Sequence, residues 1–273
     1  MENKRERSNK TVYLADDLSQ ILYHLNSINS LLILAGGTQV GNEINENCVS
    51  IRKAKELTQF EKHDRFIDFG AAVSLSKCLS LGKENIPEVL YDAISTIADN
   101  SIRNMATIGG NICAKGHKYT LWAPLIALNA RVEIRNKKET LLYPMSKFTG
   151  IEQGSILTKI RIPLDEWDLS IFKRLGPSNY ITEDSASFVF LADTQKDIIS
   201  NVRIAFTGPV TFYSHELENI LIGARLPLNH KYILQVIDEA KKIFEQIIPK
   251  ELSSDLIRDE VINLLEMSLS QLM

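Results

Sequence analysis

The sequence predicts an α+β protein whose two parts meet near residue 165. Up to that point, short apolar runs of β type alternate with segments whose apolar residues recur at helical spacing. Beyond it, strand patterns come first and helical patterns follow, which indicates a separate domain. The length of 273 residues accommodates two ordinary domains. Residues 1–10 are rich in basic side chains and lead into no apolar core, so we expect a disordered tail there.

Each element of the first part is predicted from the spacing of its apolar residues and from the residues at its ends. Asp16 and Asp17 can cap the first helix, Ser74 the second, and Pro87 opens the third. Continuous or alternating apolar residues predict the strands. In chain order we predict strand 11–14, helix 18–25, strands 31–34, 48–51 and 66–69, a helix after Ser74, helices 89–98 and 124–128, the strand pair 131–135 and 140–143, and strand 155–162.

The second part is predicted to be a small sheet followed by helices. A polar loop at 176–184 separates the first strand from the next two, and Gly223 is well placed as a helix C-cap. The predicted strands are 167–175, 187–192 and 201–206, and the predicted helices are 215–222, 229–247 and 254–269.

The composition and the motifs argue against several classes of protein. A net charge of −3 and a pI near 6.0 argue against a protein that binds nucleic acid or a membrane surface. No apolar run approaches the roughly 20 residues that cross a bilayer. Cys48, Cys78 and Cys113 show no C-x-x-C spacing, which predicts no iron–sulfur or zinc site and is typical of a reducing cytoplasm. No catalytic template and no metal-binding motif is present, so we predict neither catalytic residues nor a metal.

Two Gly-Gly segments are the strongest candidates for a binding site: AGGT at 35–38 and TIGGN at 107–111. Glycine leaves backbone N–H groups uncovered, and each segment adds a threonine hydroxyl. Neither segment is followed at once by a strong helical pattern, and neither matches a Rossmann fingerprint or a Walker loop. If folding brings the two segments together, their amides are expected to hold a diphosphate.

Six segments, in this order and at this spacing, resemble the FAD-binding (medium) subunit of the molybdenum hydroxylases, the family of xanthine dehydrogenase and carbon monoxide dehydrogenase. They are AGGT, IDFGAAVSLSKC, SIRNMATIGGNI, APLIALNARVEI, GSILTKIRIP and IFKRLG. The resemblance implies a two-lobed FAD-binding domain of the vanillyl-alcohol-oxidase/PCMH type at 11–165, with lobes of about 11–55 and 56–165. It also implies a domain like that of the CO-dehydrogenase flavoprotein at 166–273, with a three-stranded antiparallel sheet and a helix bundle.

The resemblance further implies which residues surround FAD. The two Gly-Gly segments would hold the diphosphate and the ribityl chain, and Leu157 would give a backbone contact to the flavin ring. Lys173 would be the cation that stabilises negative charge on the reduced flavin. The expected cofactor-binding residues are Ile33, Leu34, Ala35, Gly36, Gly37, Thr38, Gln39, Val40, Thr107, Gly109, Gly110, Asn111, Thr120, Leu157 and Lys173.

The chain departs from the family pattern at four of its positions. A Ser-Pro pair and a following Asp are usual after the second Gly-Gly segment, and here Gly116, His117 and Thr120 stand in their place. Gln39 replaces the acid that usually follows the first segment. A backbone cradle tolerates such changes because amides do not depend on the side chain, whereas side-chain hydrogen bonds to the flavin or ribityl chain do.

Two functions remain open from the sequence. In the first, the chain is an electron-transfer subunit of a cytoplasmic hetero-oligomer with a [2Fe–2S] small subunit and a molybdopterin large subunit, which would select the substrate. Electrons would then pass through FAD to NAD or another acceptor. In the second, the chain is a scaffold of the same fold whose flavin site has degenerated, as the four departures suggest. A free-standing flavin reductase is a weaker alternative because the C-terminal domain resembles the hydroxylase subunits.

Overall fold

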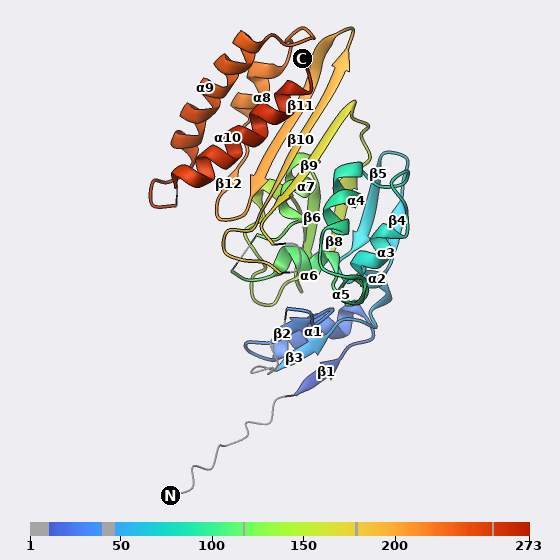
Figure 1. The fold of residues 1–273 in the computed structure, drawn as a ribbon. Coiled ribbons are helices and arrows are strands. Elements are labelled where there is room, and N and C mark those ends of the chain that lie inside the picture. The colour runs from blue at the N-terminus through green and yellow to red at the C-terminus, as the bar shows by residue number, and fades with distance from the viewer. Residues whose placement is uncertain (1–10, 40–46, 117, 178–179, 253) are drawn as a thin grey trace, which may run out of the picture.

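The computed structural model describes residues 11–39, 47–116, 118–177, 180–252 and 254–273. Three sheets follow one another along the molecule, each with its own helices (Figure 1). The smallest, in blue, lies at one end, the green and cyan sheet lies in the middle, and the orange sheet with its helices lies at the other end. Residues 1–10, which we expect to form a tail, lie outside the described ranges, and the predicted domain limits stay a proposal.

The small lobe is a parallel sheet with one helix on it. Its strands are β1 (Val12–Leu14), β3 (Cys48–Ser50) and β2 (Leu32–Leu34), in the order β1-β3-β2. Helix α1 (Leu18–Ser27) begins where Asp17 accepts a hydrogen bond from the Gln20 amide at 2.8 Å. The helix buries Leu18, Ile21 and Leu25 against the sheet because these residues recur on one of its faces.

The middle lobe is an antiparallel sheet of five strands in the order β4-β5-β8-β6-β7. The strands are β4 (Phe60–Lys62), β5 (Phe66–Gly70), β6 (Arg131–Arg135), β7 (Thr140–Pro144) and β8 (Ile156–Pro163). The helices are α2 (Lys55–Thr58), α3 (Leu75–Leu79), α4 (Glu88–Ser95), α5 (Asn100–Met105), α6 (Ile108–Cys113) and α7 (Trp122–Ala127), and a short 3-10 helix covers Met145–Lys147. Helices α3, α4, α6 and α7 pack into one hydrophobic core with the strands, whereas Leu57 of α2 belongs to the core of the small lobe.

The C-terminal sheet has a helix layer on one face and the middle lobe on the other (Figure 1). Side chains alternate between these faces, so Phe188 and Phe190 pack with the helices while Val189 and Leu191 belong to the core of the middle lobe. The strands, in sheet order, are β12 (Thr211–Phe212), β11 (Ile198–Thr207), β10 (Ala186–Gln195) and β9 (Leu169–Leu175). The helices are α8 (His215–Leu221), α9 (His230–Ile247) and α10 (Asp255–Ser270).

The structure confirms the predicted strands and longer helices and corrects the prediction in two ways. First, the three-stranded sheet carries a fourth strand, the two-residue β12. Second, a short helix of six residues, α6, begins inside the second Gly-Gly segment, where a turn was expected. The short elements α2, α5 and β4 were also missed. No helix in the described ranges is both long and apolar enough to cross a membrane.

A buried carboxylate ties two strands of the middle sheet together. Asp68 on β5 is 3% exposed and receives two hydrogen bonds from Arg161 on β8, at 2.8 and 2.9 Å. Lys159 lies 3.3 Å from the same carboxylate. Burial alone would raise the pKa of Asp68, but the Arg161 hydrogen bonds and the two positive charges outweigh it, so the pKa is lowered.

We predict that Asp68→Asn lowers the free energy of unfolding near neutral pH by roughly 1–3 kcal/mol, because it removes the charged partner of Arg161. The folded pKa of Asp68 is depressed, so this stabilisation is present above the unfolded pKa and disappears as the pH falls through the folded value. Urea unfolding of both proteins at several pH values measures this. The difference should shrink below the ordinary value of 3.8; a difference that is constant with pH would contradict the assignment.

Candidate functional site

The two Gly-Gly segments meet at the junction of the small and middle lobes. A Cβ atom on Gly36 would lie 1.9 Å from the carbonyl oxygen of Met105 and 3.1 Å from the Cα of Ala106. Met105 ends α5, and Thr107 follows two residues later. The turn after β2 therefore packs directly against the backbone that leads into α6. The condition set by the sequence, that folding brings the two segments together, is met.

The second segment, TIGGN, uses its amides within the protein. Thr107 is the N-cap of α6, and its hydroxyl oxygen accepts a hydrogen bond from the Gly110 amide at 3.0 Å. The amides of Ile108 and Gly109 donate to backbone carbonyls of the loop after β5, and the amide of Asn111 donates to the Thr107 carbonyl. The prediction that these amides are uncovered is therefore wrong. They are consumed because the segment is the first turn of a helix that packs on that loop.

Gly109 allows α6 to pack closely on the loop after β5. A Cβ at Gly109 would lie 2.5 Å from the carbonyl oxygen and 2.7 Å from the Cβ of Ala71, so only glycine allows α6 to approach so closely. The glycine pair thus has a structural reason that the sequence pattern did not reveal.

The first segment, AGGT, keeps its amides open. In the described part of the chain, no hydrogen-bond acceptor pairs with the amides of Gly36, Gly37 or Thr38. Gly37 adopts a φ of 74°, which a residue with a side chain rarely does, and its position is exposed. Consecutive free amides in such a turn form a concave anion-binding surface. Of the two predicted cradles, the structure supports this one.

A loop before α7 links both segments. The Tyr119 hydroxyl donates to the side-chain carbonyl of Gln39 at 3.0 Å, and the Leu121 amide donates to the side chain of Asn111 at 3.3 Å. Thr120 lies between them and is buried. Burial also raises the pKa of Tyr119, which keeps its hydroxyl protonated and able to donate. The loop at 119–121 therefore contacts Gln39 through Tyr119 and Asn111 through Leu121.

The remaining predicted residues have varied surroundings. Ile33 and Leu34 end β2 and are half-buried, as is Ala35 after them. Leu157 is buried in β8, next to the Thr158 carbonyl that accepts from Ala71. Two predicted or discussed positions, Val40 and His117, lie outside the described residues.

Lys173 lies on the edge strand β9 and is exposed. Its register partner is Phe188, whose side chain packs with the C-terminal helices. Lys173 therefore shares the sheet face of those helices, whereas the core that contains Ile108 and Ile112 of α6 lies on the opposite face. The structure does not bring Lys173 together with the Gly-Gly segments, and its role as the cation of the site stays a prediction.

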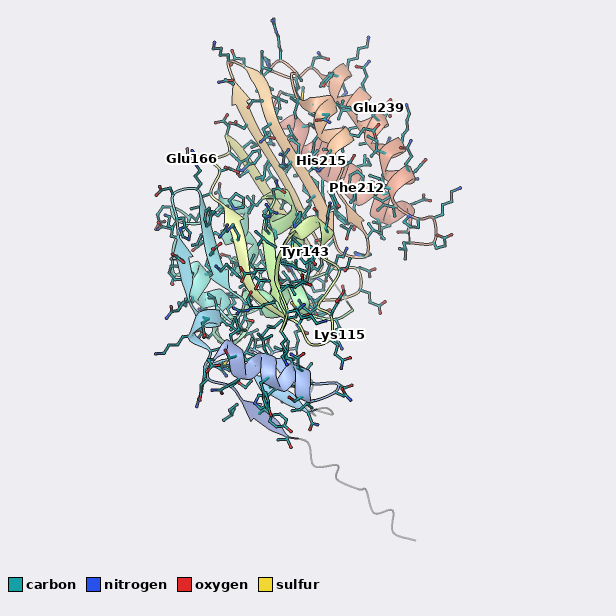
Figure 2. All side chains as sticks on the ribbon, turned by 180° about the vertical axis from the view of Figure 1, so that it is seen from behind. Lys115, Tyr143, Glu166, Phe212, His215 and Glu239 are labelled. Carbon is teal, nitrogen blue, oxygen red and sulfur yellow. The ribbon has the colours of Figure 1, made fainter. Side chains whose placement is uncertain are left out.

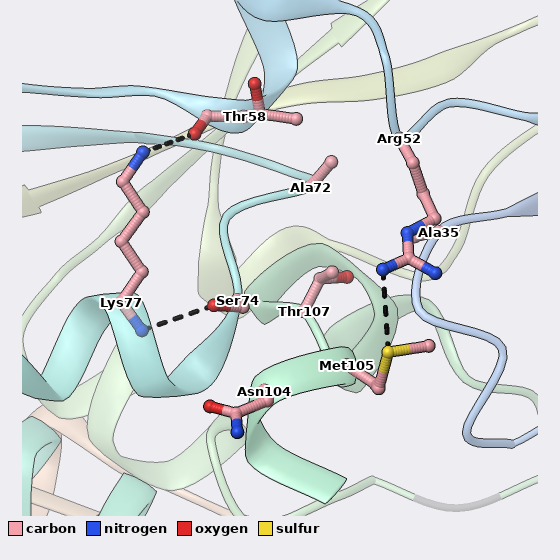
Figure 3. A pocket seen from close by; sticks show the side chains of 9 residues that line it. All are labelled: Ala35, Arg52, Thr58, Ala72, Ser74, Lys77, Asn104, Met105 and Thr107. Atoms are coloured by element: carbon pink, nitrogen blue, oxygen red, sulfur yellow. Dashed lines mark hydrogen bonds between the residues drawn. The ribbon is translucent and has the colours of Figure 1, made fainter. Parts of the chain in front are cut away.

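A cavity of about 200 Å³ opens at the junction of the two lobes, beside Ala35 and Thr107 (Figure 3). Arg52 approaches it from the small lobe and Lys77 from α3, and these cations make the junction electropositive. The Lys77 ammonium donates to the Thr58 carbonyl at 2.7 Å, and the Arg52 guanidinium lies 3.5 Å from the Met105 sulfur. Sequence reasoning missed both cations because single basic residues on separate lobes give no pattern. The cavity walls are formed by Ala35, Arg52, Thr58, Ala72, Ser74, Lys77, Asn104, Met105 and Thr107.

The donor set of this junction suits an anionic ligand that spans the two lobes. It consists of open amides, hydroxyls and cations. Among the described residues, no group of three or more His, Cys, Asp or Glu side chains is placed to bind a metal ion. The junction therefore fits a ligand with a diphosphate, as FAD has, and the arrangement serves binding rather than acid–base chemistry.

Comparison with known proteins matches the chain to a family of FAD-binding domains. A family model described as "FAD binding domain in molybdopterin dehydrogenase" matches residues 6–165. The chain is 25% identical over 273 residues to the glyceraldehyde dehydrogenase medium chain of Sulfolobus acidocaldarius, and the match covers 93% of this chain and 94% of that protein. It is 27% identical over 169 residues to abscisic-aldehyde oxidase of Arabidopsis thaliana, a match that covers 56% of this chain but 13% of that longer protein.

Two solved structures share the fold. Carbon monoxide dehydrogenase from Hydrogenophaga pseudoflava matches with a TM-score of 0.79 and 18% identity, over 96% of this chain and 95% of that chain. Quinoline 2-oxidoreductase from Pseudomonas putida 86 matches with a TM-score of 0.79 and 17% identity, over 96% and 95% of the two chains. At these identities the likeness shows the fold alone, and it confirms the predicted fold class.

We predict that Gly36→Ala separates the two lobes. Its methyl group would meet the Met105 backbone, which cannot rotate away, so the free energy of unfolding should fall by roughly 1–3 kcal/mol. Gly116→Ala is the matched control because a Cβ there meets nothing within 4 Å, although its φ of 91° adds some strain. Denaturant unfolding of both variants makes the comparison. Because the positive φ gives Gly116→Ala a cost of its own, a Gly36→Ala loss smaller than the Gly116→Ala loss would show that the Gly36 contact has no special cost.

We also predict that Thr107→Ala loses the α6 cap and destabilises the protein by about 1 kcal/mol, while Thr107→Ser retains most of the stability. The hydroxyl of either Thr or Ser can accept from the Gly110 amide, whereas alanine cannot. Thermal melts of the three proteins test this. A serine variant as unstable as the alanine variant would indicate that the Thr107 methyl group, and not the cap, matters.

Proposed function

The chain belongs to the family of FAD-binding domains in molybdopterin dehydrogenases, and from this premise we propose that it is the electron-transferring flavoprotein subunit of a molybdenum hydroxylase. In this proposal, electrons reach FAD from [2Fe–2S] clusters on a small subunit and come originally from a substrate oxidised at a molybdopterin large subunit. They leave to NAD or another acceptor. FAD is the cofactor that the family binds, and the residues of the two Gly-Gly segments, with Gln39, Thr120 and Leu157, are proposed to contact it.

Its match to a separately encoded subunit supports a multi-subunit complex. The chain covers 94% of a protein that is itself named a medium chain. In contrast, it spans 13% of abscisic-aldehyde oxidase and 18% of xanthine dehydrogenase 1 of Arabidopsis thaliana. We propose that the functions contained in the remainder of those longer proteins are supplied here by other chains.

The cysteines support the assignment of the clusters to another chain. Cys48, Cys78 and Cys113 are free thiols, and the first two are buried in different lobes. Burial raises the pKa of Cys113 to about 12, so its thiol is protonated near neutral pH. Three free thiols also suit the reducing cytoplasm in which we place the complex.

The observation that carries the proposal is the contact between the two Gly-Gly segments. Because Gly36 packs on the Met105 backbone, the open amides of AGGT lie beside the capped start of α6. In this arrangement the AGGT amides would bind the diphosphate, and Gln39 and Asn111 are held in position by the loop at 119–121.

FAD supplies the redox chemistry when it is bound, and the chain needs no acid or base of its own. The residues of the chain bind the cofactor, orient it between the lobes and exclude water from it. The buried Thr120 and Leu157 would restrict water on one side. The positively charged junction formed by Arg52 and Lys77 would favour the anionic part of the ligand.

We predict that the purified full chain is yellow, absorbs near ~450 nm because flavin is the chromophore, and contains one FAD per chain. Absorbance after release of the cofactor gives the stoichiometry. A correctly folded but colourless protein that FAD does not reconstitute would support the scaffold function instead.

Co-expression with candidate small and large subunits tests the proposed electron transfer. Adding the substrate of the complex should bleach the flavin absorbance, and persistent absorbance would contradict electron transfer.

A further inference from the structure

A row of hydroxyl side chains crosses one face of the C-terminal sheet. Strand register pairs Ser187 with Thr207 and Thr207 with Thr211. Ser187 and Thr207 are fully buried, and their hydroxyl oxygens are 3.1 Å apart. Ser187 precedes Val189 by two residues, so the row lies on the sheet face that packs against the middle lobe. These buried polar groups therefore face the lobes that form the proposed cofactor site.

Lys118 stands at the end of this row. Its ammonium donates a hydrogen bond to the Thr211 hydroxyl and lies 5.0 Å from the centre of the Trp122 ring. Lys118 comes from the loop before α7, and α7 packs on β10 and β11. The lysine thus connects the FAD-binding lobes to the C-terminal sheet across 93 residues of sequence.

The Lys118 ammonium has no carboxylate partner in the part of the chain that the structure describes. It is half-buried, and burial lowers its pKa because the charged form loses water. A hydroxyl and an aromatic face stabilise a cation only in part, whereas a buried charge is ordinarily paired. The position is therefore suited to an anionic ligand.

The loop that carries Lys118 also contacts the residue that follows the AGGT segment. Tyr119, the residue after Lys118, donates its hydroxyl hydrogen bond to Gln39, which directly follows the AGGT segment. The loop of Lys118 and Tyr119 is therefore tied to the C-terminal sheet through Thr211 and to the proposed diphosphate cradle through Gln39. Both the ammonium and the open amides attract negative charge, so an extended anionic ligand that follows this loop would meet both.

We propose that Lys118 binds an anionic group of FAD, with Thr211 holding its ammonium in position. FAD has two such groups: the diphosphate, and the pyrimidine edge of the flavin ring when it is reduced. The inference rests on the proposed FAD-binding function. It adds Lys118 to the junction cations Arg52 and Lys77. It also gives Lys118 the role expected of Lys173, because its hydrogen-bond partner Thr211 lies on the sheet face toward the middle lobe.

Lys118→Met in the full chain tests the inference, and Lys115→Met is the matched control. Lys115 lies on the same loop, is exposed and loses the same charge (Figure 2). Calorimetric titration with ADP and with FAD, and the midpoint potential of bound FAD, are measured for wild type and both variants. Lys118→Arg is included because it retains the charge and should keep most of the effect.

Two results support the inference and locate the anion. If Lys118 binds the diphosphate, Lys118→Met should weaken ADP and FAD binding alike by roughly tenfold or more. If it faces the flavin ring, ADP binding should be unchanged and the midpoint potential should fall, by about 30 mV for a tenfold change in the preference for the reduced state. Lys115→Met should change neither quantity.

A different result would overturn the inference. If Lys118→Met lowers the melting temperature but leaves ADP binding, FAD binding and the potential unchanged, Lys118 only anchors its loop to Thr211. Thr211→Val would then lower the melting temperature to the same extent. If wild-type protein binds no FAD, both the proposed function and this inference fail, whereas an unaffected Lys118→Met in a yellow protein contradicts this inference alone.

Discussion

The close approach of Gly36 to the Met105 backbone is the contact on which the site depends. The small lobe and the middle lobe have separate sheets, and the buried core of the small lobe extends to Leu57 of α2 and Ile156 of β8 in the middle lobe, so contacts at the junction set their relative position. At Gly36 one backbone rests on another with no room for a side chain. This contact brings the open amides of AGGT to the start of α6, and the cavity between Arg52 and Lys77 lies beside it.

The two Gly-Gly segments look alike in sequence, but their backbone amides have different partners. In TIGGN the amides are used by the N-cap of α6 and by the loop after β5, and Gly109 permits close packing on Ala71. In AGGT the amides are open, and Gly37 adopts a positive φ. The first segment is thus proposed to bind the diphosphate through its amides. The second is proposed to fix the backbone that Gly36 contacts and to reach the cofactor through other groups, such as Thr107 at the cavity.

Much of the fold could be predicted from the sequence because its long elements have strong periodicity. Helix α9 and the strand pair β10 and β11 are examples, and α9 begins at the Asn229 cap. Helix α6 was missed because two glycines lower helix propensity by about 1 kcal/mol each relative to alanine. The cap at Thr107 and packing on Ala71 offset this, and neither is visible from local pattern.

The candidate site was predicted in its segments but not in its details. The role proposed for Lys118 depends on its hydrogen bond to Thr211. Lys173 lies away from the Gly-Gly segments because its register partner is Phe188. Both facts depend on which distant strands pair, and a one-residue change in register would reverse the face on which Lys173 lies. Arg52 and Lys77 likewise line one cavity only because the two lobes come together, which the sequence pattern does not show.

Hydrogen exchange of the full chain with and without FAD tests whether FAD lies at the junction of the two lobes. FAD is proposed to lie at the junction, on the open amides after β2 and against the loop before α7. The account predicts new protection of residues 36–39 and 118–120 on addition of FAD, with little change at 108–111, where the amides are already bonded within the protein. Protection confined to other regions, or none in the presence of bound FAD, would contradict it.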